Sequence, residues 1–524
     1  MKNNKFRIVI PVYNAQDFIR KCIDSIKNQS YSNWECVIVN DCSTDSTNDV
    51  INESIANEPR ICYVNNTDRK YALQNIVESI RSSCKDNDDI IVLVDGDDWL
   101  ADNKVLEYLN HTYQDENIWL TYGSYKFLGG GRSSFLDTYR LFQRLNYSEN
   151  NVSHLRTFKY FLFKKVRDED LRNKNGKYYS VAWDVSIMSA MAEMAGTHAK
   201  FISKVLYVYN NISDLNDNKV RKNSQIIIGN YIQRQTPYML NGQVAKISIR
   251  LLDNNFRHTS YVSDNSIIPN YIAWYRGEDH RDFTIYTDKL LNQIDNKDSN
   301  SVNMAWLIEP RGVDKEMYQS ILTEYKKFDY VLTYDTEILE KVPNAVCVPA
   351  GGTWLRKNDF GITPKNKNVC FIVSDQLITL GHALRHEIVR RCTNKIDCVC
   401  GKGYRPIVNK YDVLKDFRYA IVVQNTNVNY YFTEQLMDCL LTGVVPIFWG
   451  NSGLGKLFNS NGIIYFTNIE ELDDILTNTV GIEDYMLRSS AIFDNFNRAH
   501  RYYCIEDYIY LNIIRNLQAG VPVE

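Results

Sequence analysis

An apolar strand that ends in three clustered carboxylates constrains this chain more than any other feature. Residues 90–94 read Ile-Ile-Val-Leu-Val, and Asp95, Asp97 and Asp98 follow at once. An unbroken apolar run of this length is typical of a strand buried on both faces. Packed carboxylates repel one another, and hard divalent cations such as Mg²⁺ or Mn²⁺ prefer oxygen ligands. The segment therefore fits a metal site, and it also fits a solvated turn after a strand.

Two more strands precede this one, and polar residues follow each of them. Residues 6–10 predict a short strand that Pro11 stops, and residues 15–28 carry apolar positions at helical spacing. Residues 34–40 predict a second strand, and the hydroxyls and acids of residues 41–47 suit a helix N-cap. The alternation of strands and helices predicts a parallel α/β sheet. Ligands of such sheets bind outside the carboxyl ends of the strands.

Three motifs in this order resemble the inverting glycosyltransferases of family 2, which have the Rossmann-like GT-A fold. They read Pro-Val-Tyr-Asn at 11–14, Asn-Asp-Cys-Ser-Thr-Asp-Ser-Thr at 40–47 and Asp-Gly-Asp-Asp at 95–98. The resemblance covers roughly residues 5–235. It implies a metal-dependent transfer of a sugar from a nucleotide-sugar, with Mn²⁺ or Mg²⁺ as the cofactor and a UDP-sugar as the donor.

The same resemblance assigns roles to single residues. Pro11, Tyr13 and Asp41 would hold the nucleobase and ribose, and Arg69 lies where the family often has a further nucleotide contact. Asp95 and Asp97 would take the ribose and the metal.

An inverting transfer also needs a general base that accepts the proton of the acceptor hydroxyl. By resemblance the base is Asp184, although Trp183 replaces the Glu of the usual Glu-Asp pair. An N-cap role for the next helix is the alternative for Asp184. His198 would complete the metal ligands, or it is a loop residue before a strand. Residues 154–159 carry basic side chains that could meet the acceptor or the diphosphate, or form a solvated face.

The length of 524 residues predicts more than one domain. Thr236-Pro237 marks a plausible boundary, after which strand-like segments begin again. We expect a GT-A domain over residues 1–237 and a second module divided into residues 238–365 and 366–524.

The second module contains a block that resembles the α1,3-fucosyltransferases, inverting enzymes of GT-B type that use GDP-fucose. Residues 417–426 predict a strand ending in Gln-Asn-Thr, a helix begins near Thr433, and residues 443–450 predict a strand ended by glycine. A helix N-terminus behind a polar turn can bind a diphosphate. The resemblance implies a GT-B-like module of two Rossmann-like subdomains.

On this resemblance Glu309, in Glu-Pro-Arg, would be the base of the second module. Arg385, Asn425 and Glu434 would bind the GDP-sugar, and no metal is expected, because cationic side chains and a helix N-terminus can neutralise a diphosphate.

The sequence departs from the fucosyltransferase pattern at two positions. Gln424 replaces a Glu, and Gln435 replaces a Lys where a diphosphate is expected. Basic residues elsewhere could compensate, or they form a solvated loop; they are Lys402, Arg405 and Lys410.

Composition excludes other classes of function. The chain has 60 Lys and Arg against 63 Asp and Glu, so its net charge of −3 gives no reason to expect nucleic acid. No run of about 18 apolar residues occurs, and residues 1–6 lead into the first strand without a signal peptide. The 12 cysteines are scattered, and Cys398-Val-Cys400 lacks a second pair for zinc. We expect reduced thiols in a cytoplasmic protein of bacterial or viral type, without a membrane anchor.

The sequence thus predicts a bifunctional glycosyltransferase that builds a glycan, with an oligosaccharide or glycan as acceptor. The first domain would use a UDP-sugar and a metal, and the second would transfer fucose or a related sugar from a GDP-sugar. The alternative is one active N-terminal enzyme with a degenerate C-terminal carbohydrate-binding module. The sequence leaves the oligomeric state open.

Overall fold

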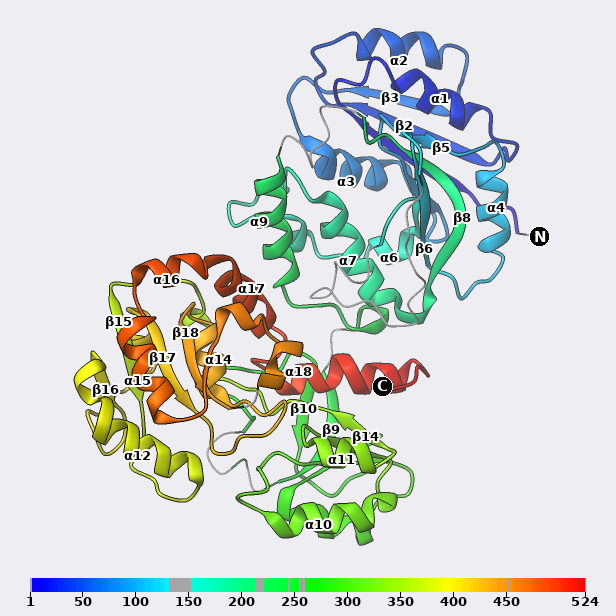
Figure 1. Cartoon of the computed structure of the whole chain (residues 1–524). Helices are drawn as coiled ribbons and strands as arrows, with labels where there is room; N and C mark the ends of the chain where they lie inside the picture. Colours follow the sequence, from blue (N-terminus) through cyan, green and yellow to red (C-terminus); the bar gives the residue numbers. More distant parts are fainter. Residues whose placement is uncertain are drawn as a thin grey trace. The chain divides into compact units, whose positions relative to one another are not determined.

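The computed structural model divides the chain into two compact units, Met1–Val244 and Ala245–Glu524. It describes residues 2–131, 152–212, 221–243, 246–253, 256, 260–450 and 452–523. Figure 1 shows both units, and each is taken by itself below.

The first unit is built on one mixed eight-stranded sheet in the order β3-β2-β1-β4-β7-β6-β8-β5. The first four strands in this order are parallel neighbours, β7 is antiparallel to β4 and β6, β6 and β8 are parallel, and β5 is antiparallel to β8. The strands are β1 (Phe6–Val12), β2 (Trp34–Asn40), β3 (Ile61–Asn65), β4 (Ile90–Leu93), β5 (Trp99–Leu100), β6 (Leu120–Phe127), β7 (Arg156–Lys159) and β8 (Ala199–Tyr209).

Helices cover both faces of this sheet, so its central strands β1, β4 and β7 are buried along their whole length. Helices α1, α2 and α4 pack on one face, and α3, α6 and α7 pack on the other (Figure 1). The helices are α1 (Ile19–Lys27), α2 (Thr47–Ile55), α3 (Tyr71–Ser83), α4 (Val105–Thr112), α6 (Tyr160–Phe163), α7 (Trp183–Ala195) and α9 (Lys222–Gln233), with short 3₁₀ turns η2 (Asp168–Leu171), η3 (Gly196–His198) and η4 (Leu240–Gly242).

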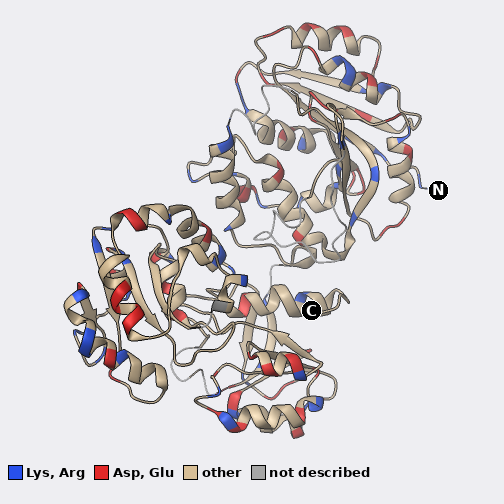
Figure 2. Ribbon diagram, viewed as in Figure 1, with Lys and Arg blue, Asp and Glu red and all other residues tan. Residues whose placement is uncertain are grey.

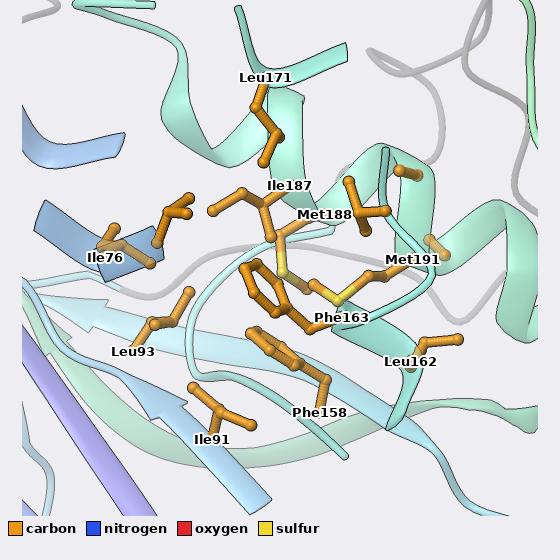
Figure 3. Packing of buried hydrophobic residues seen from close by; sticks show 14 of the residues in the cluster. Ile76, Ile91, Leu93, Phe158, Leu162, Phe163, Leu171, Ile187, Met188 and Met191 are labelled. Atoms are coloured by element: carbon orange, nitrogen blue, oxygen red, sulfur yellow. The ribbon is translucent and has the colours of Figure 1, made fainter. Parts of the chain in front are cut away.

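Alternate residues of β4 enter opposite cores. Ile90 and Val92 face the cluster that contains α1 and α4, whereas Ile91 and Leu93 face the cluster that contains α3 and α7. Figure 3 shows Ile91, Leu93 and Phe158 of the sheet packed against side chains of α6 and α7. The carboxylates that follow β4 therefore leave a strand that is held on both sides.

Pro11 does not end the first strand, in contrast to our expectation. It lies inside β1 opposite Val39 of β2, and its carbonyl accepts a hydrogen bond from Gly96 N at 3.2 Å. Proline lacks only the amide donor, so its carbonyl can still take part in a sheet.

The second unit contains two parallel sheets. One has six strands in the order β10-β9-β11-β12-β13-β14, and the other has five in the order β16-β15-β17-β18-β19. The strands are β9 (Ile247–Leu252), β10 (Ile272–Tyr275), β11 (Phe283–Thr287), β12 (Val302–Trp306), β13 (Tyr330–Thr333), β14 (Ala345–Cys347), β15 (Lys367–Ile372), β16 (Cys398–Cys400), β17 (Phe417–Val423), β18 (Val445–Trp449) and β19 (Ile464–Phe466).

The last helical segment of the second unit returns to the six-stranded sheet. Glu506 accepts hydrogen bonds from Val262 N and Trp274 Nε1, and Tyr510 stacks on Tyr271. The helices are α10 (Lys315–Glu324), α11 (Thr336–Lys341), α12 (Leu380–Cys392), α13 (Tyr411–Leu414), α14 (Glu434–Leu440), α15 (Ile469–Asn478), α16 (Ile482–Leu487), α17 (Ser489–Ala499), α18 (Ile505–Ile509) and α19 (Arg515–Gln518). Short turns are η5 (Asp288–Asn296), η6 (Tyr325–Lys327), η7 (Lys357–Asp359), η8 (Thr393–Lys395), η9 (Ser452–Lys456), η10 (Ser460–Gly462) and the π-helical η11 (Tyr510–Ile514).

Along the sequence, the six-stranded sheet ends before the predicted boundary at residue 365 and the five-stranded sheet begins after it, because this boundary falls between β14 and β15. The division into three domains, and the GT-B arrangement of the second module, stay predictions. The mixed α/β fold of the first unit is the class expected for a GT-A domain.

Charged residues of both signs are interspersed over the helices and loops of both units (Figure 2). Within the described ranges, no helix is both long and apolar enough to cross a membrane. All 12 cysteines are free thiols.

The core beneath β4 and β7 predicts a large stability effect. We expect Phe158→Ala, at a side chain with 0% exposure, to lower the free energy of unfolding of the first unit by about 3–5 kcal/mol. Differential scanning calorimetry of the intact chain would measure this as a lower transition temperature for one of two transitions. Phe493→Ala, at an exposed residue of α17, is the matched control. A loss no larger than that of the control would contradict the packing in Figure 3.

Candidate active sites

A cavity of about 250 Å³ opens beyond the carboxyl ends of the parallel strands in the first unit. Most residues proposed from the sequence for the N-terminal site line it, and they come from five separate segments. They are Pro11, Tyr13, Asp41, Arg69, Asp95, Asp97 and Asp184. The parallel sheet brings these segments together, because β1, β2 and β4 end at one edge.

Asp41 anchors the turn that carries Arg69. The carboxylate accepts hydrogen bonds from Lys70 N at 2.8 Å and Tyr71 N at 2.9 Å, and Arg69 Nε lies 3.0 Å from it. Burial alone would raise the pKa of Asp41, but nearby amides, including those of Asn75 and Lys70, outweigh burial and lower this pKa. The carboxylate therefore stays ionised and holds the turn.

Aromatic rings and guanidinium groups form a layered wall beside Asp41. The Arg69 guanidinium lies 3.3 Å from the ring centre of Tyr13 and 5.1 Å from that of Tyr71. The Arg221 guanidinium also lies over Tyr71, 4.9 Å from the centre of its ring. Such a wall offers flat surfaces to a nucleobase and positive charge to a diphosphate.

The acids after β4 lie close together and differ in environment. Asp98 is buried, accepting hydrogen bonds from the Tyr207 hydroxyl and Asn210 N, each at 2.7 Å. Burial, and then the charges of Asp97 and Asp95, raise the pKa of Asp98 well above its usual range. A bound divalent cation would oppose this repulsion, so the carboxylate set fits a hard metal ion.

His154 is the histidine that reaches this acidic cluster. Asp95, Asp98 and His154 each offer one ligand atom, and these atoms lie within 4.8 Å of one another. Burial, and then the charge of Arg156, lower the pKa of His154 well below its usual value, so the imidazole is neutral. Its Nδ1 lies 3.3 Å from Arg156 Nη1, and a guanidinium can only donate, so the ring proton lies on Nε2. In this tautomer Nδ1 accepts a hydrogen bond and Nε2 carries the proton, so the carboxylates are better ligands for a cation than His154 is.

The structure does not bring His198 to the acids, contrary to its expected role as a metal ligand. His198 stacks on Trp119 at 3.7 Å, and its Nδ1 lies 2.6 Å from Asn117 O. It precedes the eleven-residue strand β8, whose far end lies near Asp98. At about 3.3 Å a residue, the strand separates the two by roughly 30 Å.

Asp184 lies in the first turn of α7, not at its N-cap. Ala182 occupies the N-cap with a φ of +56°, and its neighbour Trp183 also lines the cavity. Asp184 Oδ2 lies 3.0 Å from Arg156 Nη2. The predicted base therefore faces the cavity beside a buried arginine.

Four cavity residues had no firm role from the sequence. His154 and Arg156 were only part of a basic segment, and Tyr71 and Arg221 were not singled out. Arg156 is the first residue of β7 and His154 lies two residues before it, but nothing local in the sequence reveals that β7 pairs with β4.

A second cavity, of about 430 Å³, lies at the carboxyl edge of the five-stranded sheet in the second unit. Arg385, Asn425 and Glu434 line it, as do Lys402, Lys410 and Gln435. Helix α14 begins directly after Thr433, near which the sequence predicts a helix start, and the Thr433 side chain accepts a hydrogen bond from Gln435 N. Glu309 and Arg405 are not among the lining residues, and Arg405 instead contacts Cys398 Sγ at 3.3 Å.

The charges around this second cavity are partly compensated. Arg385 is buried and donates to Val423 O and Asn425 Oδ1. Lys410 Nζ lies 2.9 Å from Asp438 and 3.6 Å from Glu434. Burial would lower the pKa of Lys410, but these two carboxylates outweigh it and raise the pKa. Lys410 is therefore ionised, and its charge is paired with these two carboxylates.

Glu309 lies in a separate, firmly held segment after β12. Asp288 Oδ1 accepts hydrogen bonds from Ile308 N at 3.0 Å and Glu309 N at 3.2 Å, and the Tyr318 hydroxyl donates to Glu309 O at 2.8 Å. Burial, and then the charges of Glu434 and Glu309, raise the pKa of Tyr431.

Comparison with known proteins identifies the first unit. Residues 7–172 match the profile of the family described as glycosyl transferase family 2. The N-terminal unit carries a family 2 glycosyltransferase domain.

Several curated relatives match this family 2 region. An uncharacterized glycosyltransferase of Haemophilus influenzae is 29% identical over 174 residues, which is 31% of this chain and 67% of that protein. Glycosyltransferase GlyA of Streptococcus pneumoniae is 31% identical over 119 residues, 20% of this chain and 16% of that protein. Poly(ribitol-phosphate) beta-glucosyltransferase of Bacillus spizizenii is 30% identical over 135 residues, 24% of this chain and 20% of that protein. The chain thus spans about a fifth or less of the length of two of these relatives.

Among solved structures, Staphylococcus aureus TarS in complex with UDP-GlcNAc aligns with a TM-score of 0.36 at 17% identity. The alignment covers 45% of this chain and 68% of that chain.

Asp288 predicts a pH-dependent stability of the second unit. Burial raises the pKa of Asp288 from 3.8 to about 6, and the charges of Glu309 and Asp314 add to this rise. The two backbone hydrogen bonds lower the pKa but do not outweigh burial. The folded state binds the proton of the Asp288 carboxyl more tightly than the unfolded state does. The stabilisation of the fold by this proton is therefore present below about pH 4 and is lost as the pH rises through about 6.

Asp288→Asn cannot ionise and can accept the same two hydrogen bonds. We expect the stability of the variant, relative to that of the wild type, to increase by up to about 3 kcal/mol as the pH rises from about 4 to about 7. Urea unfolding at several pH values would measure the gain, with the exposed Asp295→Asn as a control. A pH-independent difference between variant and wild type would contradict the assignment.

Proposed function

We propose that the first unit is an inverting glycosyltransferase that transfers a sugar from a UDP-sugar to a hydroxyl of a glycan acceptor. The observation that carries the proposal is the composition of one cavity, which combines the Arg69 wall, the acids after β4 and Asp184. The family 2 match over residues 7–172 supports it.

The proposed donor site uses the two sides of this cavity differently. Tyr13 and Arg69 would contact the nucleobase, and Asp41 holds the turn that carries Arg69 through the backbone of Lys70 and Tyr71. Pro11 lies beside them at the end of β1. The diphosphate would then lie toward the acids after β4.

Asp95 and Asp97 would hold Mn²⁺ or Mg²⁺ together with the diphosphate, with Asp98 beside them. The metal, when bound, supplies positive charge that stabilises the leaving diphosphate. The clustered carboxylates, and the raised pKa of Asp98, support this assignment over a solvated turn.

The proposed reaction is a single displacement. The acceptor hydroxyl oxygen forms a bond to C1 of the donor sugar, and the bond from C1 to the diphosphate oxygen breaks. The hydroxyl proton passes to the carboxylate of Asp184, and the nucleoside diphosphate leaves. Because the oxygen attacks from the side opposite the leaving group, the configuration at C1 inverts.

We further propose that the second unit transfers fucose or a related sugar from a GDP-sugar, which would make the chain bifunctional. The supporting observation is the cavity at the carboxyl edge of a parallel sheet, where Arg385, Lys402 and Lys410 gather. Arg385, Asn425 and Glu434 would bind the donor without a metal, and Glu309 would be the base.

A carbohydrate-binding module without catalysis is the competing function for the second unit. Gln424 supports it, because both polar atoms of its buried amide have no hydrogen-bond partner among the described residues. Gln435 also lines the cavity without a charge.

One experiment tests both sites. UDP-, GDP- and dTDP-sugars are screened by thermal shift and donor hydrolysis, with and without Mn²⁺, on the wild type, Asp97→Ala and Glu434→Ala. We expect Asp97→Ala to abolish a metal-dependent response to UDP-sugars and Glu434→Ala to abolish a metal-independent response to GDP-sugars.

Matched controls are Glu53→Ala, which removes an exposed ion pair with Arg20, and Glu470→Ala, which changes a first-turn glutamate of α15. Both should respond like the wild type. If every response vanishes with Asp97→Ala alone, the second unit is a binding module. If no donor elicits any response, the glycosyltransferase proposal fails.

A further inference from the structure

Arg156 occupies a central place beside the N-terminal cavity. It begins β7, and its register partner on β4 is Leu93, two residues before Asp95. Only 5% of the residue is exposed, although it lines the cavity. A buried guanidinium is costly unless its charge is paired and its donors are used.

Each nitrogen of Arg156 has a partner on a different part of the site. Nε donates to Val152 O at 3.1 Å, Nη1 to His154 Nδ1 at 3.3 Å and Nη2 to Asp184 Oδ2 at 3.0 Å. The guanidinium also lies 5.1 Å from the ring centre of Trp183. One side chain thus connects the strand beside the acids to the first turn of α7.

These contacts reach the first turn of α7, where Ser186 N and Oγ also donate to Ala182 O. Its N-cap residue, Ala182, makes no side-chain hydrogen bond and has a φ of +56°, which L-residues rarely adopt. Asp184 Oδ1 accepts from Val185 N, so this oxygen faces the helix while Oδ2 faces Arg156. The orientation of the carboxylate is therefore set by the helix on one side and the guanidinium on the other.

The same contacts distinguish Arg156 from a residue that binds the diphosphate. Its fork already bonds a carbonyl, an imidazole and a carboxylate of the protein. Arg69 and Arg221, in contrast, stack on tyrosine rings along the cavity wall.

We infer that Arg156 is a positioning residue that fixes the carboxylate of Asp184 relative to the strand ends that carry the acids. This inference rests on the proposed function of Asp184 as the base. Loss of the hydrogen bonds of the Arg156 guanidinium would leave the donor site intact and would move the Asp184 carboxylate away from the acceptor hydroxyl. Misplacement of a reacting group by about 1 Å can lower turnover on the order of 100-fold.

The test compares Arg156→Lys, which keeps the charge without the fork, and Arg156→Ala with the wild type. The readouts are UDP binding by thermal shift with Mn²⁺ and turnover of UDP-sugar hydrolysis. We expect UDP binding to be kept, turnover to fall on the order of 100-fold in both variants, and guanidinium ion to restore part of it in Arg156→Ala only.

Arg7→Lys and Arg7→Ala are the matched controls. Arg7 is another buried arginine of the same sheet; it pairs with Asp89 and Glu35 and does not line the cavity. Both controls should keep turnover even where they lower stability. Unchanged turnover in the Arg156 variants, or loss of UDP binding in parallel with turnover, would overturn the inference.

A second measurement does not depend on activity. Hydrogen exchange of the intact chain should show faster exchange in the first turn of α7, residues 183–186, in Arg156→Ala than in Arg7→Ala. Unchanged exchange there would overturn the inference. Faster exchange in a protein whose wild type hydrolyses no donor would keep the positioning role and reject the proposed glycosyltransferase reaction.

Discussion

The parallel pairing of β1 with β2 and β4 is the constraint on which the N-terminal site depends. Its hydrogen bonds continue past the strand ends, since Asp41 N donates to Val12 O and Gly96 N donates to Pro11 O. At Gly96 the segment after β4 lies so close to β1 that an added Cβ would lie 2.5 Å from Val12 Cβ. The polar residues after the three strands therefore emerge together at one edge, with little freedom to separate. Everything proposed for the donor follows from this edge.

Much of this edge was predictable because it is encoded locally. An unbroken apolar run such as residues 90–94 identifies a strand covered on both faces, and the acids after it mark the carboxyl end. Residues that reach the same edge from distant pairings were not predictable. Arg156 and His154 arrive there only because β7 inserts antiparallel between β4 and β6, and no local pattern specifies that insertion. His198 was chosen for its place in the sequence, and the length of β8 carries it away.

The second unit has a cavity at the carboxyl edge of a parallel sheet, and its resemblance to the fucosyltransferases stays a prediction. Two parallel sheets and a cavity at the carboxyl edge of one agree with nucleotide binding in general. Lys410 is ionised in this cavity, because Asp438 and Glu434 outweigh the effect of its burial and raise its pKa. The sequence named Lys410 only as one of three candidates, since burial and pairing with Asp438 depend on the packing of α13 against α14. Gln424, with no partner for its amide in the described part of the chain, is a feature that no motif revealed.

The most direct test of the central claim is a crystal structure of the intact chain soaked with UDP and Mn²⁺, with the metal located by anomalous scattering. The account predicts an anomalous peak between the carboxylates of Asp95 and Asp97 and the diphosphate, with the nucleobase against Tyr13 and Arg69. A nucleotide bound only in the cavity of the second unit, or a metal held away from Asp95 and Asp97, would contradict the account.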